Sequence, residues 1–275
     1  QGPVRSNPRK QPYDDLDLAP HLRVGQNVIA ALVTCYGTAT PWFLPPPDHS
    51  NDLVHGAFVL EADLGDERWL TTAAASWTGR VLDGWTATSG TGVSGRGIEQ
   101  IDARAVRADW TRVDPGWPPV IERRAFTVGE PGRHEPPSYP IGPFGPRPIT
   151  WPDSTVLALA PGAGGAWLLD RVSVGTLVVD AEGPAGATVT VRSAEFLDDA
   201  GRPTPTEHDA GVTFTLDGTR RRLESLDSYG LRGVLVDVDD AVTLHAVELH
   251  ERVHPVAGEA SFRCSDDALN QIWAV

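Results

Sequence analysis

The residues whose spacing most resembles a catalytic motif are His250, Glu251 and His254. They spell His-Glu-x-x-His, the pattern in which zinc proteases bind a metal with two histidines and use the glutamate as a base. That chemistry needs both histidines on one face of a helix. The residues before His250 instead alternate as in a strand, and Pro255 follows the motif. Residues four apart in a strand lie about 13 Å apart, so we expect histidines at a strand end and no zinc.

Carboxylates offer a second possible chemistry. Acidic and histidine side chains gather between residues 195 and 209: Glu195, Asp198, Asp199, Glu207, His208 and Asp209. A glycosidase needs two carboxyl groups that face each other across a sugar, whereas these residues lie beside a turn glycine and prolines, where solvated carboxylates are expected. Their spacing matches no EF-hand, and the chain contains no phosphate-binding loop, dinucleotide fingerprint or nucleophile elbow. We therefore assign no catalytic residue, no metal site and no cofactor to this chain.

Aromatic residues are the third candidate, because exposed rings can stack on sugars. Trp42 and Phe43 lie in a loop, residues 41–47, that contains four prolines, and they are our candidate carbohydrate-binding residues. We expect core or interdomain packing for four other tryptophans: Trp69, Trp77, Trp151 and Trp167. The sequence thus predicts that Trp42 is more exposed than Trp69, Trp77 or Trp167.

Composition limits the classes of partner. The chain has 275 residues, a net charge of −14 and 40% hydrophobic residues, which is typical of globular proteins. Its charge argues against nucleic acid and anionic membrane surfaces, and no run of 18 apolar residues could span a bilayer. Cys35 and Cys264 are expected to be small buried hydrophobes rather than a disulfide. A single lysine and no methionine indicate bacterial coding bias, and localisation stays open.

Alternating patterns predict strands throughout most of the chain. Residues 27–34, 56–64 and 69–77 read as strands, and Val189 and Val191 point to the side opposite Thr190. Further strand patterns follow at 234–238, after a corner at 231–233, and at 241–250, where the apolar phase slips. That slip predicts a β-bulge. No window before residue 265 predicts a long amphipathic helix, so the fold class is all-β.

Eleven prolines between residues 115 and 152 predict an extended connector, because proline lacks the amide donor that a central strand needs. We therefore divide the chain into four parts. Residues 1–114 form an N-terminal β-sandwich, 115–152 the connector, 153–257 a second β-sandwich, and 258–275 the start of a helical domain.

The last residues predict a helix. Ser265 offers an N-cap hydroxyl, Asp266 and Asp267 suit the first turn, and three apolar residues then recur at helical spacing: Leu269, Ile272 and Trp273. So short a helix is stable only when its apolar face is covered. We expect further polypeptide to follow and to pack on these three side chains.

Several segments resemble, in order, parts of the bacterial α-L-rhamnosidases of glycoside hydrolase family 78. They are residues 13–29 (Tyr-Asp-x-x-Asp-Leu before a Gly-x-Asn-Val strand), 69–77, 98–104 (Glu-x-x-Asp-Ala-Arg), 228–236 and 262–273, and residues 2–8 resemble the stretch before the first of them. Within 228–236, Leu231 and Gly233 depart from the family's usual aromatics. The loop at 41–47 and the long connector also depart from the common pattern. The resemblance implies two accessory β-sandwiches, the first without its opening strands, and the start of an α/α toroid.

This resemblance implies an inverting glycosidase whose acid and base carboxylates lie in the toroid, beyond Val275. The glycoside or glycan substrate would be bound by the parent enzyme, with neither nucleic acid nor membrane as a partner. The chain alone would then be an inactive accessory part. Two alternatives stay open: a stand-alone carbohydrate-binding module, and a structural or adhesion-type β protein.

Overall fold

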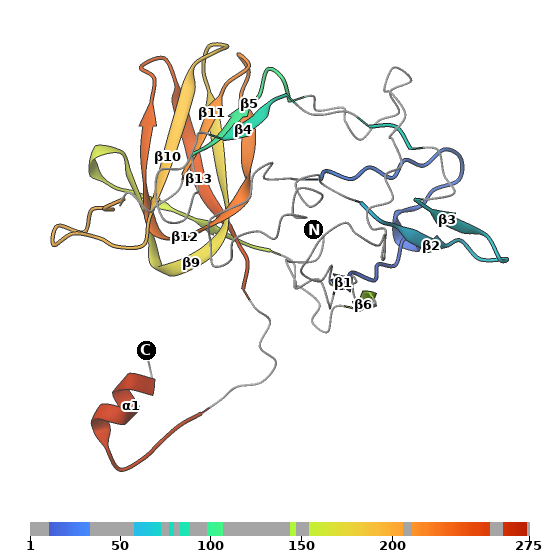
Figure 1. The fold of residues 1–275 in the computed structure, drawn as a ribbon. Helices are drawn as coiled ribbons and strands as arrows, with labels where there is room; N and C mark the ends of the chain where they lie inside the picture. Colours follow the sequence, from blue (N-terminus) through green and yellow to red (C-terminus); the bar gives the residue numbers. More distant parts are fainter. Residues whose placement is uncertain are drawn as a thin grey trace, which may run out of the picture.

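Strands make up nearly all the regular structure (Figure 1). The computed structural model describes residues 11–33, 58–72, 77–79, 83–87, 98–106, 144–146, 154–205, 211–253 and 261–273. Within these ranges there are two short 3-10 turns, Ala19–His21 and Ala163–Gly165, and one α-helix near the C-terminal end. The prediction of an all-β fold with a terminal helix is confirmed. No helix in the described ranges has the length and apolar character needed to cross a membrane.

Nine strands belong to one large sheet, in the order β4-β5-β11-β10-β12-β9-β13-β7, with β8 beside β9. Their bounds are β4 Trp85–Ala87, β5 Glu99–Asp102, β7 Thr155–Ala158, β8 Ala160–Pro161, β9 Ala166–Glu182, β10 Thr188–Ala194, β11 Gly211–Thr215, β12 Arg221–Val238 and β13 Thr243–Glu251.

The two longest strands, β9 and β12, are shared by both layers of the sandwich. In one layer the first half of β12 pairs with the second half of β9, and β13 and β7 continue the sheet. In the other layer the second half of β12 pairs with β10, and β11, β5 and β4 follow. Register shifts between Glu224 and Ser228 and between Leu231 and Gly233 let β12 turn from one layer to the other.

The core lies between these layers. Leu177, Val179 and Leu249 are completely buried on one side, and Val191 and Phe214 on the other. Burial of this apolar surface supplies the main driving force for the sandwich.

The strand predicted at 27–34 is wrong, because none of its described residues, 27–33, lies in a strand. Within the sandwich, the predicted alternation and the predicted bulge are both confirmed. Val189 and Val191 are completely buried, whereas Thr190 is half-buried. In β13 the register shifts between Leu244 and Ala246, within the segment where the apolar phase slips. The hydrophobic pattern therefore reports both which way the side chains point and where the ladder is interrupted.

Strands from before the proline-rich segment join the same sheet. β5 pairs in parallel with β11, and Glu99 lies opposite Val212. Of the 115–152 connector only β6 (Phe144–Pro146) is described, and it pairs in parallel with β1 (Gln11–Tyr13). The division into four parts at 114, 152 and 257 stays a prediction.

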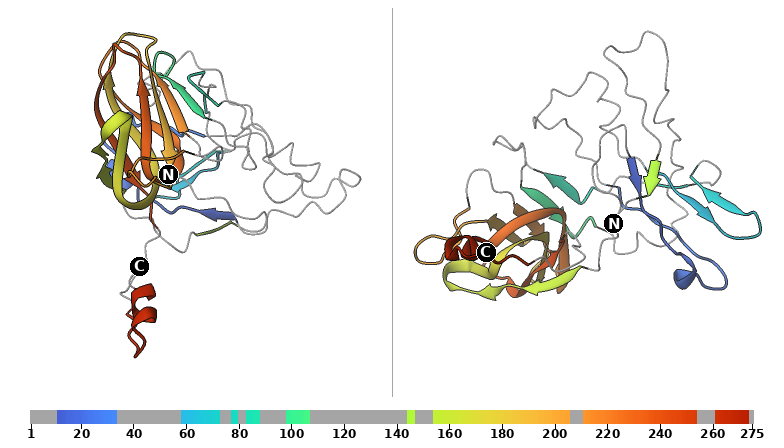
Figure 2. Two further views of the ribbon diagram at one scale, coloured as in Figure 1. Left: turned by 90° about the vertical axis from the view of Figure 1, so that its left-hand side faces the viewer. Right: turned by 90° about the horizontal axis from the view of Figure 1, so that it is seen from below.

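Two further features lie outside the sandwich (Figure 2). Strands β2 (Glu61–Asp63) and β3 (Trp69–Thr71) form an antiparallel two-stranded ribbon. The helix α1 spans Asp267–Trp273.

The N-terminal cap of α1 differs from the prediction. The carboxylate of Asp266, rather than the Ser265 hydroxyl, accepts the amide hydrogens of Ala268 and Leu269, at 2.9 and 3.4 Å. The predicted assignment of Ser265 is wrong because aspartate one residue later provides an equally good acceptor in the correct place. Cys264 is a free, half-buried thiol instead of a fully buried residue, and Cys35 lies outside the described residues.

Candidate functional site

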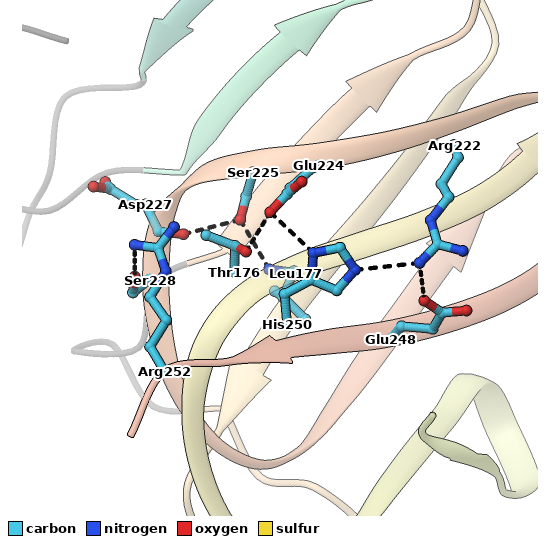
Figure 3. A network of polar contacts seen from close by, with 10 residues as sticks. All are labelled: Thr176, Leu177, Arg222, Glu224, Ser225, Asp227, Ser228, Glu248, His250 and Arg252. Atoms are coloured by element: carbon cyan, nitrogen blue, oxygen red, sulfur yellow. Dashed lines mark hydrogen bonds and ion pairs between the residues drawn. The ribbon is translucent and has the colours of Figure 1, made fainter. Parts of the chain in front are cut away.

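A polar surface covers the outer face of the layer formed by β12, β9 and β13 (Figure 3). In this layer β9 is the central strand, and Thr176 lies between His250 of β13 and Ser228 of β12. Val178 lies in the same way between Glu248 and Glu224. Long side chains from the two outer strands therefore meet above the central one. The polar residues of this layer, which we call the polar face, are Thr176, Arg222, Glu224, Ser228, Glu248, His250 and Arg252.

His250 is the centre of the polar face. Its Nε2 lies 3.2 Å from Nη2 of Arg222, and its Nδ1 lies 3.3 Å from Oε1 of Glu224. Since an arginine only donates, the ring accepts at Nε2 from Arg222, and Nδ1 faces the glutamate. Arg222 also forms an ion pair with Glu248, and Thr176 donates its hydroxyl to Glu224 at 2.5 Å. Both ring nitrogens are thus engaged.

The polar face covers apolar surface beneath it. Val178 points outward from the sheet but is only 2% exposed. Two residues further along β9, on the same face of the sheet, Asp180 accepts two hydrogen bonds from the Arg220 guanidinium, of 2.9 and 2.8 Å. These hydrogen bonds hold the pKa of the Asp180 carboxyl below its usual value. The carboxylates of Glu224, Glu248 and Asp180 are thus each engaged by a hydrogen bond or an ion pair.

Arg252 extends the polar face past the irregular part of β12. Its guanidinium donates to the Ser228 hydroxyl at 2.9 Å, and burial lowers its pKa below the usual value. The register shift in β12 between Glu224 and Ser228 is stabilised by Ser225. Its hydroxyl accepts the Leu177 amide and donates to the Asp227 carbonyl, both at 2.9 Å. Side chains therefore replace the backbone pairing that the bulge interrupts.

The structure bears directly on the zinc motif. His250 and Glu251 lie in β13, a strand, as predicted, and His254 lies outside the described residues. In the described ranges no group of three or more potential ligands is arranged to hold a metal ion. The expectation that His250 and His254 bind no zinc stays a prediction.

We expect the purified chain to contain no stoichiometric zinc, because both nitrogens of His250 already have partners. Metal analysis of the purified protein, beside a His250→Asn variant, measures this. Stoichiometric zinc in the parent that disappears in the variant would contradict it.

The acidic cluster consists of loop carboxylates where it is described. The Asp198 carboxylate accepts the amides of Ala200 and Arg202 at 2.9 and 2.8 Å, and thereby closes a turn. Glu195 and Asp199 are exposed. The remaining three residues, Glu207, His208 and Asp209, lie outside the described residues.

The tryptophans divide into packed and exposed residues. Trp167 packs on the core, as predicted. Trp77 is half-buried and meets Phe58 edge to face at 5.4 Å, and its predicted core position stays a prediction. Trp69 is 60% exposed, and its predicted core position is wrong, because it lies on the outward face of the β2–β3 ribbon. The candidate carbohydrate-binding residues Trp42 and Phe43, like Trp151, lie outside the described residues, so the prediction about Trp42 stays open.

Glu99 is a buried carboxylate that the sequence analysis named only as the first residue of the Glu-x-x-Asp-Ala-Arg segment. It is 7% exposed and accepts the amides of Leu226 and Asp227, at 2.7 and 3.3 Å, and the Tyr229 hydroxyl at 2.9 Å. Burial raises its pKa above the usual value, although these three hydrogen bonds oppose the shift. One signal was visible in the sequence, since Glu99 shares the phase of Ile101 and Ala103, which are both buried.

Comparisons with known proteins give a fold likeness. No family model matches the chain, and no curated protein does. An α-L-rhamnosidase from Dictyoglumus thermophilum has a similar structure, with a TM-score of 0.51 and 17% identity over 75% of this chain and 23% of that one. A family GH78 rhamnosidase from Bacillus sp. GL1 shares 24% identity over 42% of this chain and 13% of that one, with a TM-score of 0.35. This chain therefore spans less than a quarter of either protein, and the first comparison shows a shared fold.

Proposed function

We propose that this chain is the non-catalytic N-terminal part of a glycoside hydrolase, an inverting α-L-rhamnosidase that acts on terminal α-L-rhamnosides. The observation that carries the proposal is the fold likeness to the Dictyoglumus thermophilum α-L-rhamnosidase over 75% of this chain. The segments that resemble the family follow one another in the family's order from residue 13 to residue 273, and this support is independent of the fold.

The carboxylates that lie within the sandwich have environments that support a non-catalytic role. An inverting glycosidase needs an acid and a base about 6.5–9.5 Å apart, with room for sugar and water between them. Glu251 is 5% exposed and lies 2.8 Å from the Arg171 guanidinium, while Glu99 is enclosed by amides and a tyrosine. Glu224 and Glu248 are bound within the polar face. Each of these groups is already used to hold strands together.

The terminal helix supports a packing role for the chain. On α1, Leu269, Ile272 and Trp273 are 48%, 71% and 52% exposed, and Phe262 is the aromatic neighbour of Trp273 at a ring distance of 5.5 Å. We propose that a helical toroid packs on these side chains, since burying one such residue stabilises a protein by about 1.5–3 kcal/mol. Contact with glycan through Trp42 and Phe43 is part of the same proposal.

We expect residues 1–275 alone to cleave no aryl α-L-rhamnoside, and the full-length gene product to cleave it. Release of the aryl group, measured for both proteins at equal concentration, checks this. Turnover by the fragment would place the active site within it. An inactive full-length protein would contradict the proposed function and leave the carbohydrate-binding or structural alternatives.

A further inference from the structure

The large sheet contains two strands from a part of the chain far from its other strands. β4 and β5 come from residues 85–102, whereas the other strands of the sheet come from residues 155–251 (Figure 1). β5 pairs in parallel with β11, with Asp102 beside Thr215, and the Ala103 amide continues the pairing through a hydrogen bond of 2.9 Å to the Thr215 carbonyl. β5 thus lies on the edge of β11 in the way that an extended peptide adds to the edge of a sheet.

One face of β5 completes the core of the sandwich. Ile101 and Ala103 are each 3% exposed and lie in the apolar core with Phe214, which pairs with Ile101 across the two strands. Trp85 of β4 and Val106 pack against the same core. The burial of these apolar side chains stabilises the contact between β5 and β11.

Glu99 fixes the register of the added strand. Its carboxylate accepts the Leu226 amide at 2.7 Å and the Tyr229 hydroxyl at 2.9 Å, in a place where its side chain is only 7% exposed. A shift of the strand by two residues would place Ile101 against these donors, and a shift by one residue would turn the apolar face outward. The sandwich therefore recognises a strand with a carboxylate followed by apolar side chains two and four positions later.

We propose that the edge of β11, together with the donors that bind Glu99, is a strand-binding site that associates with residues 83–106 without a continuous chain between them. We call it the strand site. Its contacts are backbone pairing, buried apolar side chains and one buried carboxylate, and contacts of this kind give affinity and specificity when a peptide adds to a sheet edge. A second copy of this chain carries the same segment, so the residues 83–106 of that copy fit the strand site as well. This inference does not depend on the proposed glycosidase function.

The first test cuts the full chain once, after it has folded. A recognition sequence for a site-specific protease, inserted after Ile149, leaves β1 and β6 on one piece and β11 on the other. Within the described sheets, the pairing that joins the two pieces is then β5 with β11. We expect residues 1–149 and 150–275 to elute together in size-exclusion chromatography after cleavage and to separate in urea. Pieces that separate without urea would overturn the proposal.

The second test measures whether residues 83–106 alone bind the strand site. A fluorescent peptide of this sequence is added in excess to the cut protein, and we expect its fluorescence anisotropy to rise. Unlabelled peptides then compete with it, and the concentration that displaces half of the label is measured. All substitutions are made in the peptide, so no variant of the protein has to fold.

Three peptides test the parts of the contact. The Ile101→Ala peptide should compete about 30-fold less well or worse, the factor that corresponds to truncating a buried isoleucine. The Glu99→Ala peptide should also compete less well than the parent, because the donors of β12 lose their acceptor. Gln100→Ala is the matched control, since Gln100 is exposed on the other face of β5, and it should compete as the parent does. No binding of the parent peptide, or equal competition by the Ile101→Ala and Gln100→Ala peptides, would overturn the proposal.

Discussion

Replacing Gly175 by alanine should lower the free energy of unfolding by about 2–3 kcal/mol, the upper range for overpacking a buried site. A Cβ atom at this position would lie 2.2 Å from the His250 carbonyl oxygen and 2.7 Å from its carbon. The obstructing atoms are backbone, so no rotamer change relieves the overlap, and β13 would have to move away from β9. The His250 contacts of the polar face would move with it.

Gly162→Ala is the matched control, because the nearest atoms to its Cβ, those of Ala166, lie at an ordinary 3.4 Å. Without a clash, exchanging glycine for alanine is neutral or stabilises by up to about 1 kcal/mol through the unfolded state. Urea unfolding of both variants, monitored by tryptophan fluorescence, makes the comparison. If Gly175→Ala were as stable as the control, the close approach of β13 to β9 would be wrong.

Glu99→Ala should cost about 2–4 kcal/mol, because it leaves three donors of β12 without their acceptor in a largely buried site. Those donors are the amides of Leu226 and Asp227 and the hydroxyl of Tyr229, which is 3% exposed. Tyr229 retains one alternative acceptor, the Gly211 carbonyl at 3.1 Å. Glu99→Gln, which keeps the shape and one acceptor oxygen, should therefore be milder.

The Gln variant also isolates the pH dependence of this site. Burial raises the folded-state pKa of Glu99 above its ordinary 4.5, so the folded protein holds its proton more tightly than the unfolded chain does. The resulting stabilisation is fully present below pH 4.5 and is lost as pH rises through the folded-state pKa. We expect parent and Glu99→Gln to differ in their slope of unfolding free energy against pH above 4.5, with the parent losing more. Parallel slopes would mean that Glu99 is solvated.

Local patterns in the sequence predicted the strands of the sandwich but not their partners, and the strand predicted at 27–34 is wrong for its described residues, 27–33. The alternation around Val191 and the phase slip near Leu244 report directly on burial and on the bulge, since both arise from one strand's own side chains. The pairing of β5 with β11 depends on residues far apart in the chain. No periodicity within either strand encodes it.

Some residues were misjudged or missed because their role depends on distant neighbours, and one because two adjacent residues suit the same role. The partners of Glu99 lie 127 or more residues away, so its burial could be anticipated only from its phase. Trp69 was expected to be packed because large aromatic side chains are usually buried. It is exposed because it lies on the face of the β2–β3 ribbon opposite the half-buried Ala62 and Leu70. At the N-terminus of α1, Ser265 and Asp266 are both suitable capping residues, and the carboxylate of Asp266 is the one that accepts the Ala268 amide.

The sharing of β9 and β12 between both layers also constrains how the chain can form during synthesis. Neither layer is complete until β12 has been made, so neither can fold independently as an early unit. Strand β5, ending at Asp102, must wait for β11, which begins at Gly211, before its edge is paired. At about 5–20 residues per second, this interval lasts roughly 5–20 s. During that time the edge of β5 that pairs with β11 has no partner strand, and an open edge of this kind can pair with other chains.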